Sequence, residues 1–247
     1  MLPVALIHGL IGSLDDEMLV AGLAPRVVLA PDLLGYGNRA EVAREQIDLD
    51  AQVGELMRIL DAEGATRAHL VGHSVGGVVA LLFAARNPER IASVINVEGN
   101  FTLVDAFWSA NFARLPPDEA ERVLAEDSAD LAGWLRRASV EPDARTLKLA
   151  ERWLSFQPPS TVQAMAASVV EVTGDSSYSQ TLREVFAITP VHLVAGELSR
   201  DAWDVPQWAM AAARSMTLLP GGHLMMADHT ARFSQTINEL IAREESC

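Results

Sequence analysis

The sequence predicts an α/β fold: a mainly parallel sheet of about six strands, flanked by helices and interrupted by a long helical insertion. Short apolar segments alternate with helical patterns toward both ends of the chain, which is typical of a parallel sheet covered by helices. Between them, residues 101–186 contain no convincing strand and are broken by several prolines. A chain of 247 residues, of which 49% are hydrophobic, is long enough to build one such domain.

The individual elements follow from the pattern of apolar residues. Short apolar runs predict strands at 4–7, 26–30, 67–71, 91–97, 190–195 and 215–219. Helices are predicted at 51–60, 75–86, 203–214 and 230–243. The run at 91–97 is apolar almost throughout, so we expect it to be buried on both faces of the sheet.

The insertion divides the predicted core into two segments. Residues 1–100 and 187–247 form the α/β core, and residues 101–186 form a helical lid, or cap. An insertion of this length without strands is usually a lid or a binding element. It also holds most of the aromatic residues, so we expect some of them to line an apolar pocket.

Composition narrows the classes of partner. Lys and Arg total 19 and Asp and Glu total 33, and the resulting formal charge of −14 argues against nucleic acid or an anionic membrane as a partner. No apolar stretch approaches the roughly 18 residues of a membrane span, and the first residues lack the basic region of a signal peptide. Cys247 is the one cysteine, so no internal disulfide is possible. We therefore expect a cytoplasmic monomer or homodimer that acts on an apolar small molecule.

One short motif carries the chemistry. Gly72-His73-Ser74-Val75-Gly76 matches G-x-S-x-G, with a predicted strand before it and a predicted helix of small residues after it. This strand–turn–helix elbow holds a serine in a strained, exposed turn, and its glycines are needed because side chains there would clash. The N-terminus of the helix favours a developing oxyanion. We therefore predict that Ser74 is a nucleophile.

With this motif, the chain resembles the α/β-hydrolase superfamily over almost all of its length. Its segment His8-Gly9-Leu10-Ile11-Gly12-Ser13 is similar to the family's HG-x-x-G-S turn, which supplies a backbone N–H to the oxyanion hole. The resemblance implies that the N–H groups of Leu10 and Val75 hold the oxyanion. The chain begins at the strand that the family counts as its third, so we expect one sheet edge to be exposed or covered by a partner.

The predicted general base is His223. A serine hydroxyl is a poor nucleophile until a neighbouring base removes its proton. His223 lies between the last predicted strand and the last predicted helix, which is where the family keeps this base. The other histidines fall in turns, in strands or at the start of the last helix, and are interpreted as structural.

Two residues are candidates for the acid that orients His223. The family's usual position follows its seventh strand, but Ser199 occupies that position here, and Asp201 comes two residues later. Some members carry the acid after the sixth strand instead, where this chain has Glu98. A glutamate that ends an apolar strand is costly to bury without a partner, and an imidazolium is such a partner. We favour Glu98, with Asp201 as the open alternative.

The predicted reaction is hydrolysis of a small to medium apolar carboxylic ester, thioester or lactone through an acyl-enzyme on Ser74. Phe101, Phe107, Trp108 and Met225 are the predicted substrate contacts. No cofactor or metal is expected, because the sequence has no metal-ligand spacing, dinucleotide fingerprint or phosphate-binding loop. Carbon–carbon bond hydrolysis, other Ser-His chemistry on the same fold and a non-catalytic ligand receptor remain alternatives.

Overall fold

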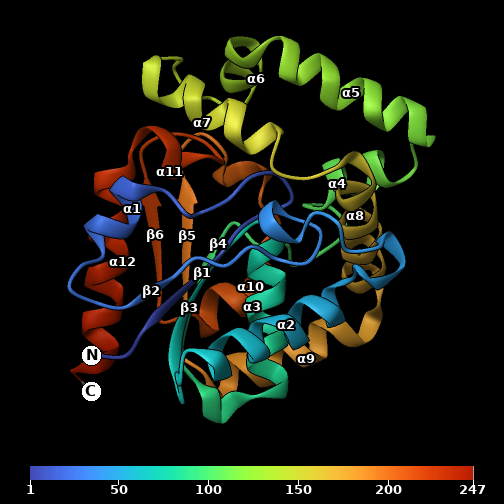
Figure 1. Cartoon of the computed structure of the whole chain (residues 1–247). Coiled ribbons are helices and arrows are strands. Elements are labelled where there is room, and N and C mark those ends of the chain that lie inside the picture. The colour runs from blue at the N-terminus through green and yellow to red at the C-terminus, as the bar shows by residue number, and fades with distance from the viewer. Residues whose placement is uncertain (247) are drawn as a thin grey trace.

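A computed structural model describes residues 1–246, and Cys247 lies outside the described part. Six parallel strands form one sheet in the order β2-β1-β3-β4-β5-β6 (Figure 1). They are β1 (Val4–Ile7), β2 (Val28–Leu29), β3 (Ala68–His73), β4 (Ile91–Val97), β5 (Val191–Gly196) and β6 (Ser215–Leu219). The predicted α/β fold with a parallel sheet of six strands is therefore confirmed.

Twelve α-helices lie within residues 1–246. They are α1 (Glu17–Gly22), α2 (Leu49–Ala62), α3 (Val75–Arg86), α4 (Phe107–Ala113), α5 (Pro117–Ala129), α6 (Leu131–Arg137), α7 (Ala144–Leu154), α8 (Pro159–Gly174), α9 (Ser176–Ile188), α10 (Gln207–Ala212), α11 (Met225–Asp228) and α12 (Thr230–Glu245). Two predicted elements are shorter than expected. Only two residues of the predicted strand 26–30 pair with β1, and the predicted helix 203–214 begins only after Pro206, which ends the preceding extended segment.

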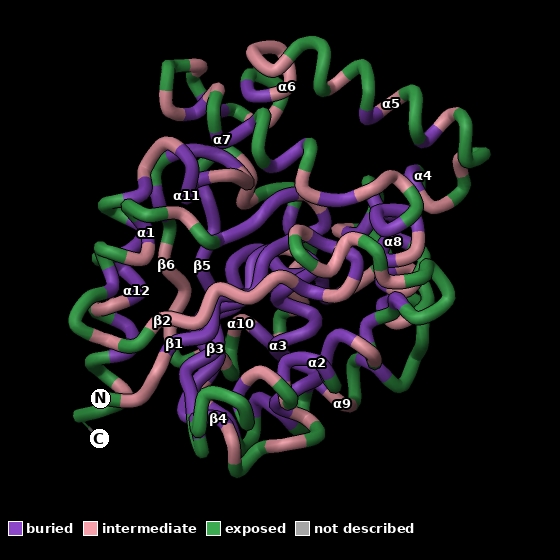
Figure 2. The backbone as a smooth tube through the Cα atoms, in the orientation of Figure 1, coloured by how far each residue is buried: buried purple, intermediate pink, exposed green. Residues whose placement is uncertain are grey.

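The sheet is buried on both faces, and each face has its own core. Alternate residues of β1 separate cleanly: Ala5 and Ile7 pack with α2, α3 and α9, whereas Val4 and Leu6 pack with α1 and α12. Figure 2 shows a buried centre between these helices, whereas the edge strands β2 and β6 are only partly buried. A period of two along a strand produces this division, because successive side chains point to opposite faces.

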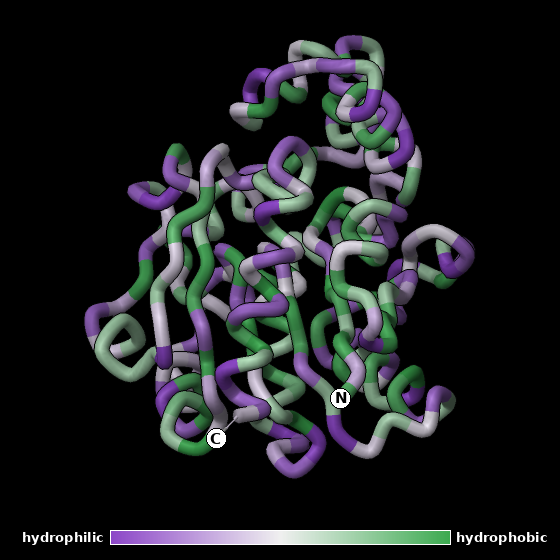
Figure 3. The backbone as a smooth tube through the Cα atoms, turned by 90° about the vertical axis from the view of Figure 1, so that its left-hand side faces the viewer, coloured by the Kyte–Doolittle hydropathy of each residue, from purple (hydrophilic) through white to green (hydrophobic). Residues whose placement is uncertain are grey.

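The inserted helices do not form one separate body. Figure 1 shows α5, α6 and α7 together above the carboxyl ends of the strands, while α8 and α9 run down one side of the sheet. Helices α8 and α9 contribute buried residues to the same core as α3, and α9 continues to Ile188. In Figure 3 the strands are hydrophobic along most of their length, whereas the upper helices alternate between hydrophilic and hydrophobic residues. The division into a core and a lid at residues 101 and 186 stays a prediction.

One edge of the sheet is formed by β2, whose two residues are partly exposed. Val27, directly before β2, is 62% exposed. Within residues 1–246, no helix combines the length and the apolar character needed to cross a bilayer.

Candidate active site

Ser74 occupies a strained turn between β3 and α3. Its backbone has φ 53° and ψ −124°, a conformation that residues other than glycine rarely adopt. The turn is held because the Ser74 N–H donates to the Val97 carbonyl (2.9 Å) and the Gly77 N–H donates to the Ser74 carbonyl (2.8 Å). A Cβ atom at Gly76 would overlap the backbone of Ile7, so the close approach of α3 to β1 requires glycine there. The structure thus forms the elbow that the motif predicts.

His223 and Glu98 meet at the carboxyl edge of the sheet. His223 follows β6, and its Nδ1 lies 2.5 Å from Oε2 of Glu98, which directly follows β4. The other oxygen, Oε1, accepts hydrogen bonds from the Gly196 N–H (2.8 Å) and the Ser199 hydroxyl (2.5 Å). Only 5% of Glu98 is exposed. Three donors therefore surround a buried carboxylate.

These hydrogen bonds keep Glu98 ionised. Burial alone would raise its pKa, but the hydrogen bond and charge of His223, together with the donors Ser199 and Gly196, outweigh burial and lower the pKa below its ordinary value. The carboxylate is thus charged at neutral pH and faces the imidazole ring.

Asp201, the alternative acid, lies elsewhere. It is exposed in the short 3₁₀ segment Arg200–Ala202 and forms no hydrogen bond or ion pair within residues 1–246. Ser199, which takes the place of the usual acid in the sequence, instead donates to Glu98. The structure brings Glu98 to His223 and leaves Asp201 apart.

A second histidine, His73, contacts the same loop. Its Nε2 lies 2.9 Å from the backbone carbonyl of His223, and the two ring centroids are 4.6 Å apart. Burial and the neighbouring His223 ring lower the pKa of His73 to about 3, so it is neutral at neutral pH. No sequence pattern singles out His73, because a histidine next to the nucleophile is equally consistent with a structural turn residue.

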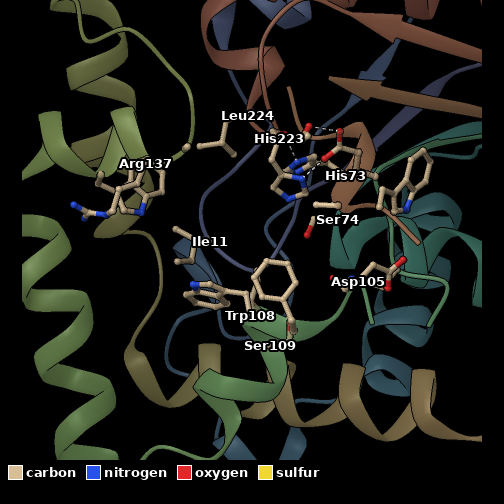
Figure 4. A pocket seen from close by; sticks show the side chains of 18 of the residues that line it. Ile11, His73, Ser74, Asp105, Trp108, Ser109, Arg137, His223 and Leu224 are labelled. Carbon is tan, nitrogen blue, oxygen red and sulfur yellow. Dashed lines mark hydrogen bonds and ion pairs between the residues drawn. The ribbon is translucent and has the colours of Figure 1, made fainter. Parts of the chain in front are cut away.

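Ser74, His223 and Glu98 line one cavity of about 630 Å³. Figure 4 shows Ser74 below His223, with Ile11 and Trp108 across the hollow. The Ser74 hydroxyl forms no hydrogen bond within residues 1–246. In unliganded enzymes the catalytic hydrogen bonds are often long and shorten only when substrate binds.

Of the two predicted oxyanion donors, only Leu10 is a lining residue of this cavity. Val75 is the first residue of α3, at the N-terminus of that helix. Neither backbone N–H donates a hydrogen bond within residues 1–246.

Two of the four predicted substrate contacts line the cavity. Phe107 and Trp108 do so, and 56% and 39% of these residues are exposed. Phe101 and Met225 do not line it, which corrects the prediction. Phe101 is buried against Phe186, Trp203 and Trp208.

Met225 is wholly buried in the core beside α12, because it begins α11 and turns inward. Its neighbour Leu224 lines the cavity instead. The prediction placed a cavity-lining residue in the correct segment, directly after His223, but chose Met225 where Leu224 lines the cavity.

The cavity also has polar ends that the sequence did not indicate. Asp105 lines one end, where it accepts hydrogen bonds from the backbone N–H groups of Phe101 (3.0 Å) and Thr102 (3.2 Å). Burial raises the pKa of Asp105 to about 6. Arg137 lies across the hollow in Figure 4 and pairs with Asp127 at 2.7 Å. No cluster of three or more metal-ligating side chains occurs within the described residues.

The chain is similar in sequence to a lipase and to a semialdehyde hydrolase. Lipase 3 of Moraxella sp. (strain TA144) is 34% identical over 110 residues, which cover 44% of this chain and 33% of the lipase. The 2-hydroxymuconate semialdehyde hydrolase of Pseudomonas sp. (strain CF600) is 25% identical over 90% of this chain and 78% of its own length. The chain thus spans about one third of the first relative and most of the second.

Solved structures share the fold. The chain superposes on a thermophilic esterase from Thermogutta terrifontis with a TM-score of 0.70, at 23% identity, over 99% of this chain and 90% of the esterase. Residues 4–236 match the sequence profile of the alpha/beta hydrolase family. Since that match takes in nearly the whole chain, including both β-strand segments of the sheet and the Ser74 elbow, the chain belongs to the alpha/beta hydrolase family.

Proposed function

We propose that the protein is a serine hydrolase that cleaves a small to medium apolar carboxylic ester, thioester or lactone through an acyl-enzyme on Ser74. One observation carries this proposal: a serine in a strained turn, a histidine and a histidine-bound carboxylate line the same cavity. This combination supplies a nucleophile, its base and the group that orients the base.

The first half of the reaction forms the acyl-enzyme. The Glu98 carboxylate engages Nδ1 of His223, so the lone pair of Nε2 is left to accept the proton of the Ser74 hydroxyl. Ser74 Oγ attacks the carbonyl carbon of the substrate. The carbonyl oxygen becomes an oxyanion, which the N–H groups of Leu10 and Val75 hold. His223 then returns the proton to the leaving alcohol, thiol or ring oxygen as the carbonyl re-forms.

The second half repeats these steps with water. His223 takes a proton from a water molecule, which attacks the acyl carbon and releases the acid from Ser74. Glu98 stabilises the imidazolium that exists between the two proton transfers, and it stays ionised because its own hydrogen bonds lower its pKa.

The lining of the cavity supports an apolar substrate. Its walls include the apolar side chains Leu10, Ile11, Phe107, Trp108, Trp134 and Leu224. A volume of about 630 Å³ suits a ligand of small to medium size. Relatives that are named lipase and esterase support the same class of bond.

A second candidate is carbon–carbon bond hydrolysis. One relative that matches over most of both chains is a 2-hydroxymuconate semialdehyde hydrolase, and a Ser-His pair serves such chemistry as well. A third hypothesis is a ligand receptor without catalytic activity. This hypothesis predicts that ligands bind equally well to wild type and to Ser74→Ala and that no covalent intermediate forms.

The test is intact-protein mass spectrometry after incubation with a fluorophosphonate. Attack by Ser74 Oγ forms an O–P bond and expels fluoride, so wild type gains one adduct and Ser74→Ala gains none. Ser109→Ala removes another cavity-lining hydroxyl and is expected to keep the adduct. An adduct that survives in Ser74→Ala, or a wild type that stays unmodified although ligands enter the cavity, contradicts the proposal.

Esters and carbon–carbon substrates are then compared on the same preparation. A series of p-nitrophenyl esters with acyl chains of increasing length reports acyl transfer directly. Turnover of an aryl or alkyl ketone-acid at its carbon–carbon bond, with esters unreactive, favours the second candidate instead.

A further inference from the structure

His73 connects the nucleophile turn to the loop that carries the base. It is the last residue of β3 and directly precedes Ser74, and its ring reaches across to the segment after β6. The Nε2 atom lies 2.9 Å from the carbonyl oxygen of His223, 150 residues further along the chain. Figure 4 shows the two rings one beside the other, next to Ser74.

The chemistry of this contact fixes how His73 is protonated. A carbonyl oxygen only accepts, so Nε2 carries the proton and donates it. The ring is neutral, since burial and the His223 ring lower its pKa to about 3. Its Nδ1 faces Gly9, where an added Cβ would lie 3.0 Å from that nitrogen. Glycine at position 9 therefore leaves room for the ring.

The contact is the one hydrogen bond that the His223 carbonyl accepts within residues 1–246. On its other side, the His223 ring is held at Nδ1 by Glu98. The side chain and the backbone of the base are thus held from the ends of two different strands, by Glu98 directly after β4 and by His73 at the end of β3. The half-exposed His223 side chain, 42% accessible, has little packing of its own to fix it.

We propose that His73 is a positioning residue of the reaction: its Nε2–H holds the backbone of His223 at a fixed place relative to Ser74. This role rests on the proposed function, because it matters only when His223 must take a proton from Ser74. Since His73 directly precedes Ser74 in the chain, this hydrogen bond fixes the distance between the nucleophile turn and the backbone of the base. A neutral ring is required for this, because a protonated one would repel the imidazolium that forms on His223 during each proton transfer.

Two substitutions separate the hydrogen bond from simple packing. His73→Phe keeps a ring and removes the donor, whereas His73→Gln keeps an N–H at nearly the place of Nε2. Displacement of a catalytic group by about 1 Å costs roughly 100-fold in rate, so we expect His73→Phe to lower the rate constant of phosphonylation and kcat by about that factor. His73→Gln is expected to recover most of the loss, and KM is expected to change less than kcat.

A third variant keeps the test decisive if the apolar ring disturbs folding. His73→Asn carries an amide one methylene shorter than that of His73→Gln, too short to reach the His223 carbonyl. The proposal requires His73→Gln to react faster than His73→Asn, with thermal unfolding showing both folded. Equal rates for these two, or a His73→Phe variant as reactive as wild type, overturn it. A wild type that forms no adduct at all refutes the proposed function instead, so the two failures are distinguishable.

Discussion

Replacing Glu98 by glutamine tests the catalytic geometry most sharply, because the surrounding donors dictate how the amide must lie. The Gly196 N–H is a fixed donor to Oε1, so the glutamine oxygen has to take that position. The amide nitrogen then faces Nδ1 of His223, where the carboxylate oxygen now lies 2.5 Å away. Since that nitrogen only donates, Nδ1 must accept, and the ring proton moves to Nε2.

This tautomer removes the base. With Nε2 protonated, His223 has no lone pair to take the proton of Ser74, and no carboxylate stabilises an imidazolium. In a triad of this kind, the same acid-to-amide change lowers kcat about 10⁴-fold, and we expect a loss of 10³- to about 10⁴-fold here. This corresponds to about 4–5 kcal/mol of transition-state stabilisation.

The assay is the rate of phosphonylation and of p-nitrophenyl ester hydrolysis at neutral pH, with Asp201→Asn as the matched control. Asp201 is exposed and contacts neither His223 nor Glu98, so its substitution is expected to change the rate by no more than about twofold. The reasoning is refuted if Glu98→Gln keeps about a tenth or more of the wild-type rate. It is equally refuted if Asp201→Asn loses as much as Glu98→Gln.

Two further predictions concern stability. Gly12 has φ +96°, and a Cβ there would lie 2.6 Å from the buried Trp153 ring, so Gly12→Ala should lower the free energy of unfolding by about 2–5 kcal/mol in urea titrations. Gly64→Ala, at φ +65° with nothing near, should lower it by only about 1–2 kcal/mol, and equal losses would contradict the clash. Burial lowers the pKa of His8 to about 4 and that of His73 to about 3, whereas each has a pKa of 6.5 in the unfolded chain. Below pH 6.5 the unfolded chain therefore binds more protons than the folded protein. Each histidine should therefore lower the free energy of unfolding by about 1.4 kcal/mol per pH unit from pH 6.5 down to about 4, and a value that stays level over this range refutes the burial argument.

The fold was predictable because the signals that specify it are local. The apolar runs at 4–7 and 91–97 match β1 and β4 residue for residue, and the run of small apolar residues at 75–86 matches α3. The carboxyl ends of neighbouring parallel strands meet at one edge, so Ser74 and Glu98 had to lie near each other once those strands were placed.

The rest of the site depends on distances that no local pattern encodes. The sequence left Glu98 and Asp201 open, because the path of the loop after β5 decides which carboxylate reaches His223. A 3₁₀ turn carries Asp201 outward there, and Ser199 turns inward to Glu98. Phe101 and Trp108 look alike as apolar residues, yet only Trp108 borders the cavity.

The contact between Gly12 and the insertion has a consequence for recombining this protein with its relatives. The Gly12 N–H donates to Gln157 at 3.0 Å, and Trp153 covers the same glycine. The loop that carries Leu10 is thus held in part by two residues of the predicted helical insertion. A chimaera that exchanges residues 101–186 as a cassette therefore also replaces the residues that contact this loop. Keeping 143–157 native should preserve turnover while the rest of residues 101–186 is exchanged.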